Sequence, residues 1–372
     1  MSRAGDVPFV RGRLLHAVLP LARPLETAHG AIEAREAVIV ALEDGDGRVG
    51  WGEATPLPEF GTEPFGACRG RLEALLEGVT SLAGGATPCA DFAWSTAMRD
   101  LAARRDEASF ARRLAREAGY GDDLPKAVAS QALVGGATPE AVASSARARK
   151  AEGFRAFKLK LAVSPEARSL GSDLDRVAAL RQVVGPDARL RLDANEAWTE
   201  DQARRALIAL APFDVDYVEQ PVARDDLDAL GRLAAKADVP IAADEALLHD
   251  GWRACLARRT VSIWIAKPAA LGDLDVSLEL ARGVAEAGGR LVWSTLIDGA
   301  LGRGVARALA AATGAPDEIH GLGTGPLLAA DLVAESDPVD AGTLPTPARP
   351  GLGLTPAGPV LEAATLLREV VR

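Results

Sequence analysis

The stretch Phe157-Lys158-Leu159-Lys160 places two lysines two residues apart inside an apolar segment. Side chains two residues apart in a β-strand point to the same face, so the two amines are expected side by side. The chain has 42 basic residues, of which six are lysine: Lys126, Lys150, Lys158, Lys160, Lys236 and Lys267. A partly buried lysine can release a proton near neutral pH, whereas arginine cannot, so the pair is a candidate for proton transfer. The alternative is a solvated strand edge.

Around this stretch, apolar segments of strand length alternate with amphipathic segments of helical length from residue 126 onward. The expected strands are Ala127–Leu133, Phe157–Leu161, Leu190–Ala194, Asp216–Gln220, Pro240–Asp244, Ser262–Ala266, Arg290–Ser294 and Glu318–His320. Between them lie expected helices such as Pro139–Ala151, Asp201–Leu210 and Asp273–Ala287. Eight such strands joined by seven helices predict a closed parallel barrel, not an open sheet.

The region before the barrel predicts a small α+β domain. It contains a strand from Phe9 to about Ala22, a polar loop at Arg23–Gly30, a hairpin around Asp44-Gly45-Asp46-Gly47, and helices near Pro64–Leu82 and Asp91–Ala118. After the barrel, Asp337–Pro359 is rich in proline and glycine, and a last helix is expected at Val360–Val371. We expect this tail to return to the N-terminal domain, giving domains of residues 1–125, 126–324 and 325–372.

Composition excludes several classes of partner. The chain of 372 residues carries a formal charge of −10 and has no basic cluster, which argues against nucleic acid and anionic membranes. No apolar run is long enough to span a bilayer, and the first residues do not form a signal peptide. Three widely spaced cysteines (Cys68, Cys89 and Cys255) suggest neither a disulfide framework nor a zinc site, so we expect a cytoplasmic protein.

Three carboxylates occupy the ends of three successive expected strands: Asp193, Glu219 and Asp244. The active site of a parallel barrel lies at the carboxyl ends of its strands, so these side chains should converge. Carboxylates without histidine or cysteine suit a hard cation such as Mg²⁺. Each acid could alternatively cap the helix that follows it. Lys160 before them and Lys267 after them make that alternative weaker for the whole set.

The two lysines come from the second and the sixth expected strand and should face each other across the barrel mouth. A divalent cation can hold the carboxylate of a substrate, and a lysine beside it can then remove the proton from the α-carbon. Ser294 lies at the end of the next expected strand. The polar residues at the strand ends, from Lys160 through the three carboxylates and Lys267 to Ser294, follow one another at intervals of 23 to 33 residues. That interval is the length of one strand–helix unit.

These motifs resemble the enolase superfamily, in its muconate-lactonizing-enzyme-like subgroup, and most closely the o-succinylbenzoate synthases of menaquinone biosynthesis. The resemblance rests on Gly50-Trp51-Gly52-Glu53, Lys158-Leu159-Lys160, Arg191-Leu192-Asp193-Ala194-Asn195, Glu219-Gln220-Pro221, Asp244-Glu245, Lys267-Pro268 and His320-Gly321-Leu322-Gly323-Thr324. It implies a modified TIM barrel, (β/α)7β, with an α+β capping domain formed by the N-terminal region and the C-terminal tail. Ala246 and Gly323 depart from the pattern, since a hydroxyl residue and an acid are common there.

The resemblance also implies roles for individual residues. Asp193, Glu219 and Asp244 would bind one Mg²⁺; Lys160 would be the general base, Lys158 would help to set its basicity, and Lys267 would steady an enediolate as a cation. Arg191 and Asn195 would neighbour the metal and a small carboxylate substrate, and Ser294 and Thr295 would border the substrate tail. Loops at Arg23–Gly30 and Pro56–Thr62 would close over the site from the cap.

Three functions remain open at this point. The favoured one is a lyase that eliminates water from a cyclohexadiene carboxylate with a succinyl chain. Its rival on the same scaffold is a racemase of N-acylamino acids or an epimerase of dipeptides. The third is a non-catalytic descendant retained for structure or binding, which is disfavoured because every proposed catalytic position keeps a competent residue. Fold alone does not choose among them, and the oligomeric state is not predicted.

Overall fold

The computed structural model describes residues 7–27, 30–82, 86–162, 169–333 and 339–372. Its centre is a parallel sheet of seven strands in the order β11-β10-β9-β8-β7-β6-β5. The strands are β5 (Ala132–Val134), β6 (Ala156–Lys160), β7 (Arg189–Asp193), β8 (Val215–Glu219), β9 (Ile241–Ala243), β10 (Ile263–Ala266) and β11 (Arg290–Trp293).

Two further strands complete the ring. β12 (Ile319–His320) pairs in parallel with β4 (Ala127–Ser130), which directly precedes β5, and a bridge between Ser294 and Gly321 links β11 to β12. The expected first strand is therefore split at Gln131 into β4 and β5. The predicted (β/α)7β barrel is confirmed.

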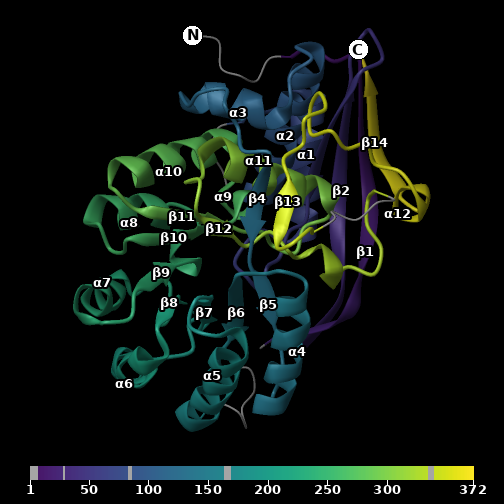
Figure 1. The fold of residues 1–372 in the computed structure, drawn as a ribbon. Coiled ribbons are helices and arrows are strands. Elements are labelled where there is room, and N and C mark those ends of the chain that lie inside the picture. The colour runs from purple at the N-terminus through teal and green to yellow at the C-terminus, as the bar shows by residue number, and fades with distance from the viewer. Residues whose placement is uncertain (1–6, 28–29, 83–85, 163–168, 334–338) are drawn as a thin grey trace.

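Helices on the outside of the barrel connect its strands (Figure 1). They are α4 (Pro139–Ala151), α5 (Leu170–Val184), α6 (Glu200–Leu210), α7 (Leu227–Lys236), α8 (Gly251–Arg258), α10 (Leu274–Glu286) and α11 (Ala300–Thr313). Local sequence explains where several begin, because Thr138, Ser169, Thr199 and Asp226 each accept a hydrogen bond from a first-turn backbone amide. A short helix, α9 (Pro268–Leu271), directly follows Lys267.

The cap is an antiparallel sheet in the order β14-β1-β2-β3 with three helices. Its elements are β1 (Arg11–Thr27), β2 (Gly30–Glu43), β3 (Val49–Ala54), β14 (Thr365–Val371), α1 (Phe65–Glu77), α2 (Pro88–Arg105) and α3 (Phe110–Ala118). The hairpin predicted at Asp44–Gly47 joins β2 to β3. Gly50 and Gly52 let β3 lie directly on α2, since a Cβ on Gly52 would fall 1.9 Å from the Ala93 carbonyl oxygen.

The predicted final helix at Val360–Val371 is wrong. Only a short helix, α12 (Pro359–Glu362), forms there, and the chain then continues as β14, which pairs antiparallel with β1 (Figure 1). The open edge of β1 offers backbone partners to this segment, and tertiary pairing overrides its leucine-rich, helix-like pattern. The tail also reaches the barrel, because β13 (Thr343–Pro345) pairs antiparallel with β4.

Two other expectations in the cap need correction. The single helix expected over Asp91–Ala118 is two helices, because Glu107 has a positive φ of 51° and Ser109 starts a new helix by capping Arg112. The polar loop expected at Arg23–Gly30 is strand as far as Thr27 and again from Gly30, while residues 28–29 lie outside the described part.

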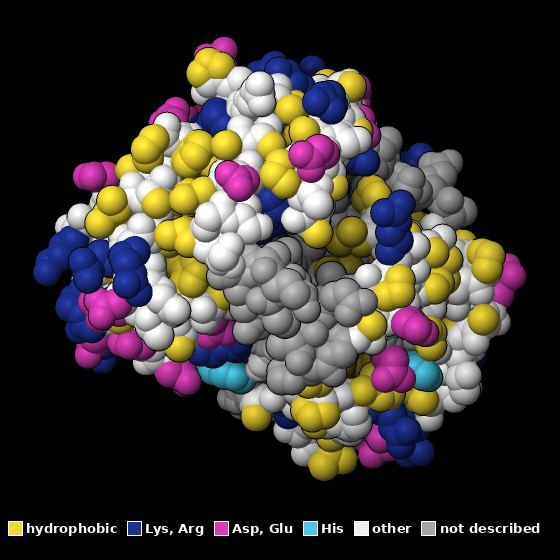
Figure 2. All heavy atoms as spheres, turned by 90° about the horizontal axis from the view of Figure 1, so that it is seen from below, with side chains coloured by type: hydrophobic (Ala, Val, Ile, Leu, Met, Phe, Trp, Pro, Cys, Tyr) yellow, Lys and Arg dark blue, Asp and Glu magenta, His cyan; other side chains and the backbone are white. Residues whose placement is uncertain are grey.

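The molecular surface carries both signs of charge. On the face shown in Figure 2, acidic and basic side chains are interspersed. Among the described helices, none combines the length and the apolar character needed to cross a bilayer.

Candidate active site

Lys158, Asp193 and Glu219 form a buried ionic cluster at the carboxyl ends of three adjacent strands. In the strand register, Lys160 lies beside Asp193 and Asp193 beside Glu219. The Lys158 Nζ lies 2.9 Å from the Asp193 Oδ2 and 2.8 Å from the Glu219 Oε1. All three side chains of this cluster are buried, whereas Lys160 is exposed. The two amines expected on one face of β6 therefore have different environments.

Asp244 and Lys267 add a second ion pair from the next strands. Asp244 follows β9, Lys267 follows β10, and the Lys267 Nζ donates a hydrogen bond to the Asp244 Oδ1. The ring of Phe60, from the cap, covers the Lys267 ammonium, with 4.4 Å between Nζ and the ring centroid. The side chain of Lys267 is only 10% exposed. The structure thus brings together five of the predicted catalytic and metal-binding residues through direct contacts or strand pairing, and Lys267 joins them through Asp244.

Two neighbouring side chains orient this cluster. The Gln220 Oε1 accepts hydrogen bonds from the backbone amides of Asp244 and Ala246, both at 3.1 Å, and its amide nitrogen donates to the Val222 carbonyl. Asn195 donates to the Glu245 Oε1 at 3.2 Å, and its backbone amide donates to the Asp193 Oδ1. Gln220 and Glu245 were not assigned roles from sequence, although both belong to the motifs that carry the resemblance.

The charges within the cluster shift the pKa values of its members. Burial alone would lower the pKa of Lys158, but the charges of Asp193, Glu219 and Asp244 outweigh burial and raise it well above its usual value. Burial would raise the pKa of Asp193, but Lys158 and Lys160 outweigh it and lower that pKa. Burial raises the pKa of Glu219 and of Asp244. A bound cation would oppose the rise for Glu219 and Asp244, because it would favour their charged forms.

The donor set fits a hard divalent cation. Three buried carboxylates converge from adjacent strands, and the Glu219 Oε2 is buried without a hydrogen-bond partner in the described structure. Within the described ranges, no three acidic, histidine or cysteine side chains already form a closed metal-binding group. The ammonium groups of Lys158 and Lys267 instead hold the carboxylates. Asp193, Glu219 and Asp244 are the residues that would hold the ion.

Ser294 and Thr295 lie at the end of β11, where the barrel closes on β12. Their hydroxyls contact the β12 end: the Ser294 Oγ donates to the Gly321 carbonyl at 3.4 Å, and the Thr295 and Thr324 hydroxyls are 2.8 Å apart. Both side chains are buried. They are placed at the carboxyl end of the strands, as expected, and their contact with a substrate stays a prediction.

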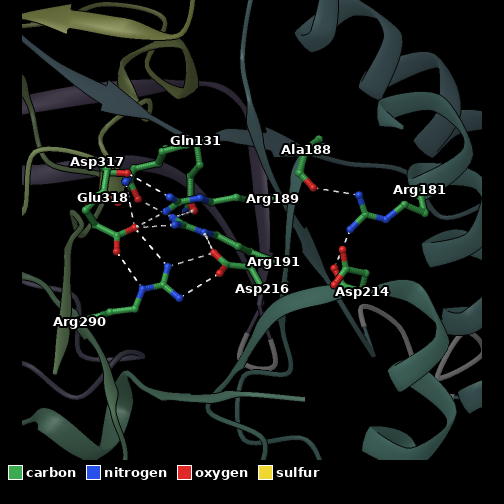
Figure 3. Close-up of polar contacts among 11 residues, drawn as sticks. Gln131, Arg181, Ala188, Arg189, Arg191, Asp214, Asp216, Arg290, Asp317 and Glu318 are labelled. Atoms are coloured by element: carbon green, nitrogen blue, oxygen red, sulfur yellow. Dashed lines mark hydrogen bonds and ion pairs between the residues drawn. The ribbon is translucent and has the colours of Figure 1, made fainter. Parts of the chain in front are cut away.

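Arg191 lies apart from the cluster, in an ion network at the amino ends of the strands (Figure 3). It points into the barrel two residues before Asp193 and is fully buried. Its guanidinium donates to Asp216 at 2.9 Å and Glu318 at 2.7 Å, and Arg290 bridges the same two acids at 3.0 Å. A shift in the pairing of β7 with β8 accompanies this placement of Asp216. The guanidinium donors of Arg191 bind this network, and its expected contact with a substrate stays a prediction.

Comparison with known proteins agrees with this geometry. The enolase C-terminal domain-like family matches residues 140–359, which is more than half of the chain. The chain belongs to the enolase superfamily. An o-succinylbenzoate synthase from Thermobifida fusca is 30% identical over 83% of this chain and 80% of that protein. Muconate cycloisomerase 1 from Acinetobacter baylyi is 27% identical over 90% and 94%, in agreement with the muconate-lactonizing-enzyme-like subgroup.

Relatives with a different activity are equally close. A hydrophobic dipeptide epimerase from Enterococcus faecalis is 32% identical, over 59% of this chain and 62% of that protein. The crystal structure of a dipeptide epimerase from the same organism, complexed with Mg and the dipeptide L-Leu-L-Tyr, matches with a TM-score of 0.82 at 25% identity, covering 93% of this chain and 99% of that chain. This superfamily member therefore has both synthase and epimerase relatives.

Proposed function

We propose that this enolase-superfamily protein is a Mg²⁺-dependent lyase of the o-succinylbenzoate synthase type, acting in menaquinone biosynthesis in the cytoplasm. The observation that carries the proposal is the cluster of Asp193, Glu219 and Asp244 between Lys160 and Lys267 at the barrel mouth. A bound Mg²⁺ would supply positive charge at the carboxylate of the substrate. The substrate class is a small carboxylate with an acidic α-proton.

The chain's own residues divide the reaction between them. Lys160, exposed at the end of β6, takes the α-proton of the substrate as general base. The resulting ammonium then gives that proton to the departing hydroxyl group on the same face, so that water leaves and the ring becomes aromatic. Lys267, partly buried and paired with Asp244, stays charged and stabilises the enediolate. Lys158 holds Asp193 and Glu219 in place.

One feature of the site argues against the dipeptide epimerase. A dipeptide carries an α-ammonium group that a buried site must pair with an acid. The segment His320-Gly321-Leu322-Gly323-Thr324, which ends β12 beside Ser294 and Thr295, carries no acid. An acyl chain needs no such partner. This disfavours the dipeptide epimerase and leaves N-acylamino acid racemisation as the second candidate, because that reaction uses the same two lysines.

The test is a comparison of substrates on the purified protein. We expect rapid dehydration of the cyclohexadiene carboxylate precursor of 2-succinylbenzoate, and kcat/KM values at least about 100-fold lower for a panel of N-succinylamino acids and hydrophobic dipeptides. Glu369→Gln, which changes an exposed acid of the cap, is the matched control and should leave all rates unchanged. Faster turnover of any N-succinylamino acid than of the cyclohexadiene would transfer the proposal to the racemase.

A further inference from the structure

The cap segment of residues 57–62, here called the cap loop, is joined to the barrel by one arginine. Arg224 follows β8, and its Nη1 donates a hydrogen bond to the Phe60 carbonyl oxygen at 2.7 Å. The side chain of the same Phe60 lies over the Lys267 ammonium. The bond from Arg224 therefore fixes a cap residue whose ring reaches a proposed catalytic lysine.

Arg224 is itself held by Glu196 in a forked arrangement. Its Nε lies 3.0 and 3.1 Å from the two carboxylate oxygens, its Nη2 donates to Oε2 at 2.5 Å, and its backbone amide donates to Oε1 at 2.6 Å. These bonds leave Nη1 directed at the cap loop. A forked pair fixes the plane of the guanidinium, which lysine could not do.

The backbone that carries Glu196 is in an unusual conformation. Asn195 and Glu196 have positive φ values of 42° and 62°, which non-glycine residues adopt rarely. The conformation is held by a hydrogen bond of 2.8 Å from the Glu196 amide to the Gln220 carbonyl. Such conformations cluster at functional sites, where the surroundings maintain them. Here it directs Glu196 toward Arg224, three residues after a proposed metal ligand.

The cap loop fits this partner closely. Gly61 has a positive φ of 112°, and a Cβ there would lie 2.6 Å from the Arg224 Nη1 and 2.9 Å from the Leu248 Cδ1. The loop is also closed on itself, since the amides of Phe60, Gly61 and Thr62 donate to the Leu57 or Pro58 carbonyls. The loop therefore meets the barrel as one compact unit, and Arg224 is a charged donor in that contact.

We propose that Glu196 and Arg224 form a latch that holds the cap loop closed over Lys267, so that Phe60 shields this ammonium and the substrate beside it from water. Arg224, Glu196 and Phe60 are positioning residues in this account. The shielding of Lys267 matters for function only if Lys267 has its proposed catalytic role. The latch does not depend on that role, because its contacts are hydrogen bonds within the chain. A closed loop is needed for binding, so opening it raises KM by the factor by which the closed population falls.

The first measurement is hydrogen exchange of the peptide that covers residues 57–62, in the full chain without substrate. Arg224→Ala removes the latch, and we expect exchange there to rise at least about tenfold, the factor for losing one hydrogen bond from a charged donor. The matched control is Arg232→Ala, which breaks an equally forked pair with Glu200 on the outer helices. It should leave the peptide unchanged.

The second measurement is steady-state kinetics on the substrate that the protein turns over. Arg224→Ala should raise KM, by a smaller factor than exchange, because exchange follows the open population and KM follows the closed one. It should change kcat less, and Arg224→Lys should recover part of the loss. Phe60→Leu should keep slow exchange but lose activity, and Phe60→Trp should retain it. Unchanged exchange in Arg224→Ala, or an equal rise in Arg232→Ala, overturns the latch. Faster exchange with unaltered KM overturns its link to the site. A wrong substrate assignment leaves the exchange result standing.

Discussion

At the residue scale, the site is a balance between three buried carboxylates and three lysines. Lys158 bridges Asp193 and Glu219, and Lys267 binds Asp244, so the amines occupy positions that a cation would share. Removing Asp244 would take this carboxylate from the largely buried Lys267 ammonium, which is costly. These residues were predictable from sequence, because strand parity and the spacing of strand–helix units put them at one end of the barrel.

Metal dependence is the prediction that belongs to this scale. Treatment with a chelator should abolish turnover, and Mg²⁺ should restore it. Because the metal would bind only the folded protein, added Mg²⁺ should also raise the midpoint of thermal unfolding of the chelated protein. Glu219→Gln should lose both effects, with activity down by at least about 1,000-fold. Full activity of the chelated protein, or an unaltered midpoint on adding Mg²⁺, would contradict the metal site.

Some contacts of the described residues could not be predicted from sequence. Arg191 lies two positions before Asp193 and shares its face, yet its guanidinium is bound to Asp216 and Glu318 at the amino ends of the strands. The alternation of side chains along a strand predicts the face on which a residue lies. It does not predict how far along the barrel axis the end of a long side chain reaches. Phe60 and Arg224 come from segments 164 residues apart, and nothing in either segment alone indicates that they meet.

At the element scale, the junction between β3 and α11 depends on Glu53. This buried cap carboxylate accepts hydrogen bonds from the amides of Gly299 and Gly302, at the start of a barrel helix. Burial, with the nearby charges of Asp298 and Asp331, raises the pKa of Glu53 from 4.5 to about 8. Arg35 lies close enough to interact with Glu53 and Asp298 as well. The folded protein therefore holds a proton that the unfolded chain releases.

The pH dependence of stability follows from that difference. A raised carboxyl pKa contributes stability that is fully present below pH 4.5 and is lost as the pH rises through about 8. The free energy of unfolding, measured by urea titration, should therefore fall between pH 5 and 8. Glu53→Gln should flatten this fall, although its baseline is lower because a backbone amide loses its acceptor. The exposed Glu369→Gln should keep the slope. A slope unchanged by Glu53→Gln would contradict the assignment.

Elements were predictable where local and tertiary signals agreed. The helix Pro139–Ala151 matches its sequence prediction, with a threonine cap and an early proline. The segment Val360–Val371 has a helical pattern, but the free edge of β1 recruits it as a strand. The break between α2 and α3 depends on a positive φ at Glu107, which sequence does not indicate.

At the scale of the whole molecule, many contacts join the cap to the barrel. Arg99 of α2 bonds to Asp273 and Asp275 at the start of α10, β3 meets α11 through Glu53, and the tail pairs with both β4 and β1. The domain limits at residues 125 and 324 remain a prediction. These contacts indicate that the cap and the barrel depend on each other for stability.

Deletion tests that interdependence. Without residues 1–125, the segment 126–372 loses the partner of β14, the acid at the start of α11 and the Phe60 ring. We expect it to be at most partly folded, with a lower unfolding midpoint and no substrate selection, measured by circular dichroism and kinetics. Adding residues 1–125 as a separate chain is the control for reassembly. A fragment that folds alone and keeps its specificity would contradict a single functional unit.

The central claim is that Lys160 alone transfers protons while Lys267 acts as a fixed charge. A racemase must exchange protons on both faces of the α-carbon, whereas a syn elimination needs one face. The deciding measurement incubates N-succinylamino acids of each hand in D₂O with wild type, Lys160→Ala and Lys267→Ala, beside dehydration of the cyclohexadiene carboxylate. The account predicts rapid dehydration that Lys160→Ala eliminates, with negligible deuterium incorporation into either enantiomer. Efficient incorporation into both enantiomers, each hand requiring a different lysine, would contradict it.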